Sequence, residues 1–275
     1  AVFSIVVIAV VLIVLGIPHG AVDHLVDEGG TSTGFHTRYV GTALAVLAMW
    51  ALSASVSLIL FLLVSVHHFG QSDLARLRIG GRGQIALQWS RGVFVVGTPL
   101  VAHIDGVAPI IERLGGGRPA AWTWLAGDTA WWVAALVPQP AMLLAGARWT
   151  KAMSTNEVCW NLVSLAALAS IFVAADPLIG FAVYFGLWHA ADHITATRHV
   201  LEAPSGGPIS LTRFFRLAAS RALVSAVGIV AVAAVLVAVG RVDDVVPAMV
   251  VLVSAITVPH LVVVESMWRR PDRSS

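Results

Sequence analysis

The sequence predicts an all-α integral membrane protein, a polytopic helical bundle of about eight transmembrane helices, plus or minus one. Apolar residues make up 58% of the 275 residues and charged residues only 12%, whereas soluble domains carry about 25% charged residues. The apolar residues also occur in blocks of about 17 or more, which is long enough for a helix to cross a bilayer. No separate soluble domain is expected, so residues 1–275 are predicted to form a single integral membrane domain.

The first four predicted spans are separated by polar or turn-forming residues. Span 1–18 is apolar until a Pro-His-Gly sequence ends it, and span 40–66 is a long apolar run that ends at two adjacent histidines. The next spans are 86–104 and 122–138, the second of which contains an aspartate and four tryptophans expected in an interfacial belt. Glycines at 115–117 mark a flexible loop between them.

The second half of the chain continues with spans at 158–174, 177–194, 216–239 and 246–264. The short apolar segment 139–152 either extends the span before it or lies on the membrane surface. Lys and Arg are concentrated in alternate loops and in the C-terminal tail. The positive-inside rule therefore predicts a multi-pass protein of the cell (inner or plasma) membrane with its C-terminus in the cytoplasm. The net charge of +2 comes from these loops and predicts no nucleic-acid binding.

Histidines are the most informative residues of this apolar chain. An imidazole in hydrocarbon is costly without a partner, so intramembrane histidines indicate a functional site, and several together are typical of a transition-metal site. The single cysteine, Cys159, excludes an intrachain disulfide and Cys-rich zinc or iron–sulfur sites. Six of the ten histidines lie inside or beside the apolar runs: His19, His67, His68, His189, His193 and His260.

The strongest local motif is LWHAADH at 187–193. His189 and His193 are four residues apart, so on a helix they share a face and can bind one ion together. The alternative is that they are two unrelated histidines at a helix end. A zinc-protease HExxH site is excluded, because Ala190 occupies the position of the catalytic glutamate.

A second motif, GIPHGAVDH, occupies residues 16–24. Pro18 breaks regular helical hydrogen bonding. His19 and Asp23 are four residues apart, so Asp23 is predicted to orient the His19 ring, as carboxylates often orient metal-bound imidazoles. Alternatively, the Pro-His-Gly sequence caps the first span at the membrane interface and His24 is solvated.

Two further motifs contain histidines, SVHHFGQSD at 65–73 and a later TVPHLVVVE. His67 and His68 point about 100° apart on a helix, so only one is expected to face a site. Asp73 either supports that histidine or is a solvated loop carboxylate. His260 is either a site residue or a core histidine bonded to a carbonyl. Imidazole ligands suit zinc, copper or ferrous iron, and the residues alone do not choose among them.

These motifs, in this order, resemble those of the Brp/Blh family, the bacterioopsin-related proteins and Blh-type β-carotene 15,15′-dioxygenases. The resembling pieces are GIPHGAVDH, HHFGQSD, SRGVFVVGTPLVAH, FGLWHAADH and the late VPH, spread over nearly the whole chain. The resemblance implies an integral membrane enzyme in which histidines hold non-haem Fe(II). Such an enzyme cleaves β-carotene at its central double bond with O₂ to give two retinal molecules, and retinal then serves as the chromophore of a microbial rhodopsin.

The resemblance also implies roles for particular residues. The family's iron ligands carry over to His19, His68, His189 and His193, and further site candidates are Asp23, His24, His67, Asp73, Asp192 and His260. Three aromatic residues, Phe69, Phe185 and Trp188, are expected to pack on the polyene. Asp192 departs from the family pattern, which often has a basic residue just before the second histidine of HxxxH. This departure is expected to affect the choice of carotenoid.

Other classes of protein remain as alternatives. A transporter or channel would use intramembrane histidines to carry protons or a metal ion, but it needs acidic partners at depth, and the spans contain few. A bis-histidine haem cytochrome would have a visible Soret band. A di-iron desaturase requires HxxHH boxes, which are absent, and a carotenoid-holding protein does not require clustered imidazoles.

Overall fold

The computed structural model of the protein describes residues 2–27, 33–75, 77, 81–115, 129–150, 153–205 and 207–269. Every regular element in these residues is a helix, which confirms the all-α class. The backbone divides into two compact units. Unit 1 comprises residues 1–8 and 58–184, and unit 2 comprises residues 9–57 and 185–275. The single integral membrane domain predicted for residues 1–275 stays a prediction.

Several helices are long and apolar enough to cross a membrane, which confirms a polytopic helical protein. Within the described residues there are six, or seven if the bent pair Ala130–Leu136 and Pro138–Arg148 forms one span. This number agrees approximately with the predicted eight, plus or minus one. Part of the predicted span 122–138, residues 122–128, lies outside the described residues. The six candidate spans, two of which combine consecutive helical elements, are Phe3–Val26, Ala54–Asp73, Gly81–Ala102, Thr155–Ala174, Leu211–Ala238 and Val242–Trp268.

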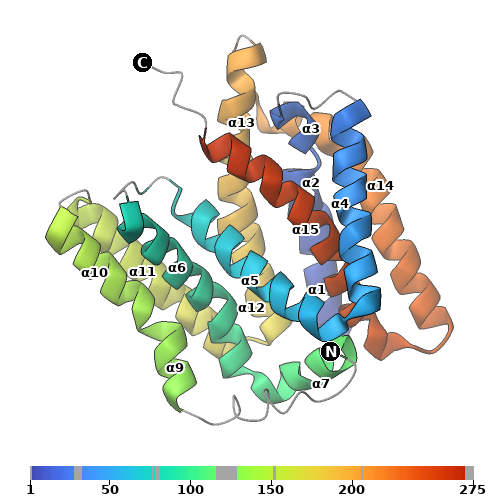
Figure 1. The fold of residues 1–275 in the computed structure, drawn as a ribbon, viewed down its shortest axis with the longest axis horizontal. Helices are drawn as coiled ribbons and strands as arrows, with labels where there is room; N and C mark the ends of the chain where they lie inside the picture. Colours follow the sequence, from blue (N-terminus) through green and yellow to red (C-terminus); the bar gives the residue numbers. More distant parts are fainter. Residues whose placement is uncertain are drawn as a thin grey trace. The chain divides into compact units, whose positions relative to one another are not determined.

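Unit 1 is organised around α6 (Figure 1). Helices α7, α9, α10, α11 and α12 contact α6 or one another, and α5 crosses it closely. A Ser154–Glu157 capping box begins α11, and Asp176 accepts a hydrogen bond from the Leu178 amide at the start of α12. The helices are α5 (Ala54–Asp73), α6 (Gly81–Ala102), α7 (Ile104–Gly115), α9 (Thr129–Leu136), α10 (Pro138–Thr150), α11 (Thr155–Ala174) and α12 (Pro177–Tyr184).

Two glycines allow α5 and α6 to touch through their backbones. A Cβ added at Gly70 would lie 1.8 Å from the Gln88 carbonyl oxygen, and one added at Gly92 would lie 1.8 Å from the Val66 carbonyl oxygen. No side chain larger than hydrogen fits at either position. This close approach fixes α5, which carries His67, His68 and Asp73, against the central helix of unit 1.

Replacing Gly92 with alanine is therefore expected to destabilise the protein. Overpacking costs typically about 1–3 kcal/mol, and here the obstacle is a backbone oxygen that cannot rotate away. Thermal unfolding in detergent measures the effect. Gly97→Ala on the same helix is the matched control, because its Cβ would meet Ala135 Cβ at an ordinary 3.6 Å. Equal melting temperatures for the two variants would contradict the close approach of α5 and α6.

Unit 2 contains the long helices α4, α14 and α15 and several short segments. Helices α4 and α15 lie side by side (Figure 1), and the Trp50 indole donates a 2.7 Å hydrogen bond to Ser254 between them. The N-terminal helix α1 (Val2–Val11) leads into this unit. The other elements are η1 (Leu12–Gly16), α2 (Ile17–Gly20), α3 (Asp23–Val26), α4 (Thr33–Leu52), η2 (Phe185–Ala190), α13 (Ala191–Ser205), α14 (Leu211–Ala238), η3 (Val242–Asp244) and α15 (Val245–Arg269).

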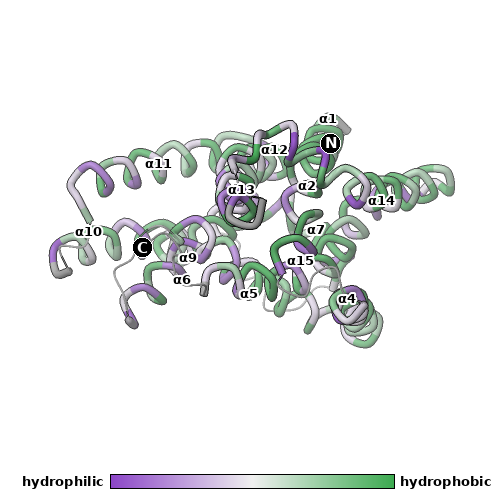
Figure 2. Tube along the Cα trace, turned by 90° about the horizontal axis from the view of Figure 1, so that it is seen from above, coloured by the Kyte–Doolittle hydropathy of each residue, from purple (hydrophilic) through white to green (hydrophobic). Residues whose placement is uncertain are grey.

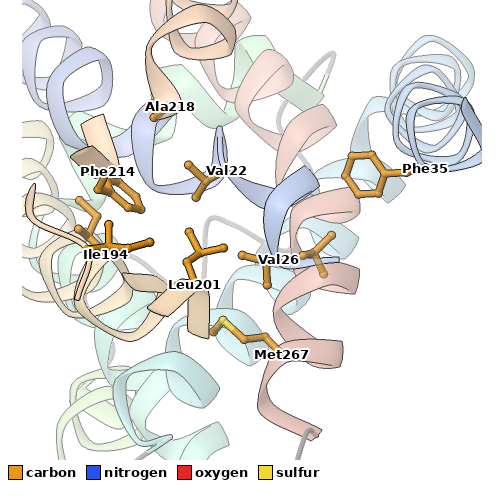
Figure 3. Packing of buried hydrophobic residues seen from close by; sticks show 10 residues of the cluster. Val22, Val26, Phe35, Ile194, Leu201, Phe214, Ala218 and Met267 are labelled. Atoms are coloured by element: carbon orange, nitrogen blue, oxygen red, sulfur yellow. The ribbon is translucent and has the colours of Figure 1, made fainter. Parts of the chain in front are cut away.

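The core of unit 2 joins segments that are far apart in the sequence. Val22 and Val26 from the N-terminal segment pack with Ile194 and Leu201 of α13, Phe214 of α14 and residues of α15 (Figure 3). Burial of such side chains contributes roughly 1.5–3 kcal/mol each. This core holds α3, α13 and α15 together, and a histidine lies on or beside each of these helices.

The residues of α14 are apolar along most of its length (Figure 2). Leu223, Val224 and Val227 are all exposed on it. Exposed apolar side chains of this kind are unfavourable in water but are the normal exterior of a helix in lipid. The surface of α14 therefore supports the assignment of a membrane protein.

Two predicted spans differ from the observed helices. The predicted span 40–66 is two helices, α4 and α5, separated at Ser53. The predicted span 177–194 is also interrupted, since it consists of α12, the π-helix η2 and the first part of α13. Helix α13 then continues to residue 205.

Candidate metal centre

The segment that carries His19 is shaped by a proline. Pro18 has no amide hydrogen and its ring crowds the carbonyl four residues earlier, so regular α-helical bonding cannot continue through it. The helix widens just before this point into the π-helix η1, in which the Ile17 amide bonds the Leu12 carbonyl. The short helix α2 then presents His19, whose side chain is buried.

A second π-helix, η2, carries His189. π-helical turns are rare and frequently occur at functional sites, because the extra residue rotates the side chains that follow. His189 lies inside η2, and His193 lies one turn later on α13. Both rings are buried, and their centroids are 6.1 Å apart. The pair therefore shares one face, as the HxxxH spacing predicted.

The two π-helices pack directly against each other through glycines. A Cβ at Gly16 would lie 2.5 Å from the Phe185 ring, and a Cβ at Gly186 would lie 3.0 Å from Val11. The Phe185 ring stacks on His189 at 5.4 Å and meets the edge of His19 at 5.7 Å. The glycines thus bring His19 and His189 together, with Phe185 beside both rings.

Four imidazoles meet in unit 2, and we call them the histidine cluster: His19, His189, His193 and His260. The centroid of the His19 ring lies 4.9 Å from that of His260, 5.1 Å from that of His193 and 5.5 Å from that of His189. One ring nitrogen of His19 and one of His260 lie within 4.8 Å of each other. All four side chains are buried.

Asp23 binds His260 rather than His19. Nδ1 of His260 lies 2.9 Å from both carboxylate oxygens, and the Tyr39 hydroxyl donates to the same carboxylate at 3.2 Å. The prediction that Asp23 orients His19 is therefore wrong. The reason is local: α2 ends at Gly20 and a turn separates it from α3, so His19 and Asp23 are not on one continuous helix.

The hydrogen bonds of the cluster indicate which ring nitrogen of His260 and of His193 is the candidate metal ligand. Nδ1 of His260 faces Asp23, and Nδ1 of His193 lies 3.2 Å from the Thr197 hydroxyl, so Nε2 is the candidate ligand atom of each ring. Neither ring nitrogen of His19 has a hydrogen bond to any described residue, although the side chain is buried. Buried polar atoms normally have a partner, so the donor set fits a transition-metal ion.

The predicted site residues of α5 belong to unit 1. His68 and Phe69 are buried, whereas His67 is half-buried and its ring lies 6.0 Å from that of Trp89. Asp73 is not a solvated loop carboxylate, because it is buried and bound to Arg91 and Tyr184. That His68 shares a metal with the histidine cluster stays a prediction.

The remaining predicted residues belong to unit 2. His24 is buried on α3 rather than solvated, and Asp192 and Trp188 are half-buried beside His193 and His189 in the sequence. Sequence reasoning did not find Tyr39, Thr197, Arg91 or Tyr184. Only Arg91 had a signal of its own, since an arginine inside an apolar span indicates a functional or structural partner.

Asp23→Asn is expected to lower metal affinity about 10–100-fold, because a neutral amide orients and polarises the His260 ring less well than a carboxylate. Metal content after dialysis against a graded series of chelator concentrations measures the change. Tyr39→Phe is the matched control, since it removes one hydrogen bond to Asp23 and keeps the contact between Asp23 and His260. We expect a smaller loss in this control. Wild-type affinity in Asp23→Asn would separate Asp23 from the metal site.

Apolar membrane-spanning helices that enclose four buried imidazoles define a polytopic membrane protein with a candidate metal centre. The chain matches the family described as beta-carotene 15,15′-dioxygenase over residues 10–268, and it belongs to that family. It is 24% identical over 197 residues to a protein named beta-carotene 15,15′-dioxygenase from an uncultured marine bacterium, 66A03. The match covers 67% of this chain and 66% of that relative, just under two thirds of its length. No solved structure matches the chain.

Proposed function

We propose that this protein is a membrane-embedded, non-haem Fe(II) oxygenase that cleaves β-carotene at the 15,15′ double bond with O₂ and releases two retinal molecules. The observation that carries the proposal is the histidine cluster in a chain of the beta-carotene 15,15′-dioxygenase family. Bound Fe(II) would supply the electrons that activate O₂, whereas the protein would supply orientation and access.

The proposed iron ligands are His19, His189, His193 and His68. To these we add His260, because its ring is the nearest of the cluster to His19 and because Asp23 orients it in the way that carboxylates orient metal-bound imidazoles. His68 is included on the family resemblance and on its own burial in an apolar helix.

The proposed substrate suits the environment of the cluster. β-Carotene is a C40 hydrocarbon that dissolves in lipid, so we propose that it enters from the bilayer and lies along apolar and aromatic side chains. Phe185, which stacks on His189, is the best supported of the proposed lining residues, with Trp188 and Phe69 as further members. Asp192, next to His193, is proposed to influence which carotenoid is accepted.

The proposed user of the product and the proposed cellular location follow from the retinal product and from the distribution of basic residues along the chain. Retinal is the chromophore of microbial rhodopsins, so we propose that a rhodopsin of the same cell uses it. The concentration of basic residues in alternate loops and in the tail supports a cell-membrane location with the C-terminus in the cytoplasm.

Expression in cells that accumulate β-carotene tests the proposal. We expect loss of the pigment and formation of retinal, both measured by chromatography, and neither change in cells that express a His189→Ala/His193→Ala variant. Intact β-carotene beside folded, iron-loaded protein would contradict the proposal. That result would favour another carotenoid substrate, with Asp192 as the first residue to replace, or the transporter alternative.

A further inference from the structure

Unit 1 contains a buried ionic cluster that the proposed chemistry does not use, and we call it the Asp73 cluster: Asp73, Arg91 and Tyr184. Arg91 Nε donates to Asp73 Oδ2 at 2.9 Å, and the Tyr184 hydroxyl donates to Asp73 Oδ1 at 3.0 Å. The side chains of Arg91 and Asp73 are 5% and 6% exposed, and Tyr184 is fully buried. The three residues come from three different helices, α6, α5 and α12.

Stability alone does not account for this cluster. Removing a carboxylate and a guanidinium from water costs several kcal/mol per ion, and apolar residues of similar volume often stabilise a protein equally well or better. The pairing here is also incomplete, since Arg91 Nη1 is buried without a hydrogen bond to any described residue. In some proteins a buried ionic network instead fixes a single arrangement of the elements that it joins.

The position of the cluster in the chain indicates which arrangement it fixes. Asp73 lies five residues after His68 on α5, and Tyr184 is the last residue of α12, directly before the π-helix that carries His189. The Tyr184 ring is held by Phe69 at 5.5 Å and Phe172 at 6.0 Å. The Asp73–Tyr184 hydrogen bond therefore ties α5, the helix that carries His68, to the last residue of α12.

We propose that the Asp73 cluster positions the proposed iron ligand His68: it fixes the register between α5 and α12 within unit 1 and thereby the direction in which the His68 side chain points. Asp73, Arg91 and Tyr184 are positioning residues and do not contact the metal. The inference rests on the proposed function, because it assigns the cluster to the same iron site. Ligands held loosely bind a metal less tightly and in more than one geometry, even when all of them are present.

Tyr184→Phe tests the proposal, because it removes only the hydroxyl and keeps the ring among its aromatic neighbours. We expect Fe(II) affinity, measured by chelator competition, to fall about 10-fold, in the range of other outer-shell changes. We also expect the electron paramagnetic resonance spectrum of the Fe(II)–nitric oxide adduct to broaden. Asp73→Asn should change both readouts in the same direction.

Ser90→Ala is the matched control. Ser90 neighbours Arg91 on α6, is buried, and bonds Gln139 at 2.5 Å, but it does not join α5 to α12. We expect it to lower the melting temperature and to leave Fe(II) affinity and the spectrum unchanged. Equal Fe(II) affinity in wild type and Tyr184→Phe, or equal losses in Tyr184→Phe and Ser90→Ala, would overturn the positioning role alone. A wild-type protein that binds no Fe(II) would overturn the proposed function and this inference together.

Discussion

Alanine at both His189 and His193 is expected to abolish iron binding and retinal formation while the protein still inserts in the membrane. The two rings are buried on one face and lie within 5.5 Å of His19, so their loss removes half of the histidine cluster. We expect a fall in Fe(II) affinity well beyond the roughly 10–100-fold that loss of an outer-shell partner costs. The loss of iron binding is measured as the amount of iron per protein, determined by mass spectrometry of the purified membrane protein.

His199→Ala is the control for this variant. His199 lies on the same helix as His193, but it is exposed and pairs with Glu202 at 3.0 Å. Its replacement removes an imidazole from α13 without touching the cluster, so iron content and retinal formation should equal those of the wild type. A His189→Ala/His193→Ala protein that retains stoichiometric iron would show that the metal is bound elsewhere.

His68→Ala is expected to lose iron and activity, whereas His67→Ala is expected to keep both. The two residues are neighbours on α5 and point about 100° apart, so only one direction can serve a single site. His68 is 3% exposed, whereas His67 is half-buried and lies near Trp89. The pair compares two imidazoles at nearly the same place in the chain, which makes each variant a control for the other.

Iron content and retinal formation, measured for both variants in parallel, decide the assignment. A loss confined to His67→Ala would reverse the roles of the two residues. Wild-type behaviour in both would remove α5 from the ligand set. Iron would then be held by His19, His189, His193 and His260 of unit 2 alone.

Much of the fold was predictable because the bilayer imposes simple rules on sequence. Long apolar runs predicted helices, and helices such as α11, α14 and α15 lie where the runs occur. The break at Ser53 was not predictable in this way, because it falls within a run that hydropathy treats as continuous. The π-helices were also missed, since hydropathy does not distinguish an α-turn from a wider one.

The candidate site was predictable where its residues are neighbours in sequence. The HxxxH spacing placed His189 and His193 on one face, and the structure brings them together. The same spacing rule failed for His19 and Asp23, because it assumes an unbroken helix and the chain turns between them. Asp23 instead meets His260, which is 237 residues away. The sequence contains no signal for a contact at that separation.

The Asp73 cluster illustrates the same limit. The sequence leaves Asp73 as either a supporting residue or a solvated carboxylate, and its burial excludes solvation. Its partners come from two other helices, and neither Arg91 nor Tyr184 lies near it in the sequence. An intramembrane arginine does predict that an acidic partner exists. Only the packing of the helices identifies which residue that partner is.

The most direct test of the account is product analysis with purified protein in lipid nanodiscs, supplied with β-carotene and O₂ before and after removal of its metal. We predict two retinal molecules for each β-carotene consumed, no product after chelation, and recovery with Fe(II) but not with Zn(II). Retinal formation by the metal-free protein, or aldehyde products of unequal length, would contradict an iron centre that acts at the central double bond.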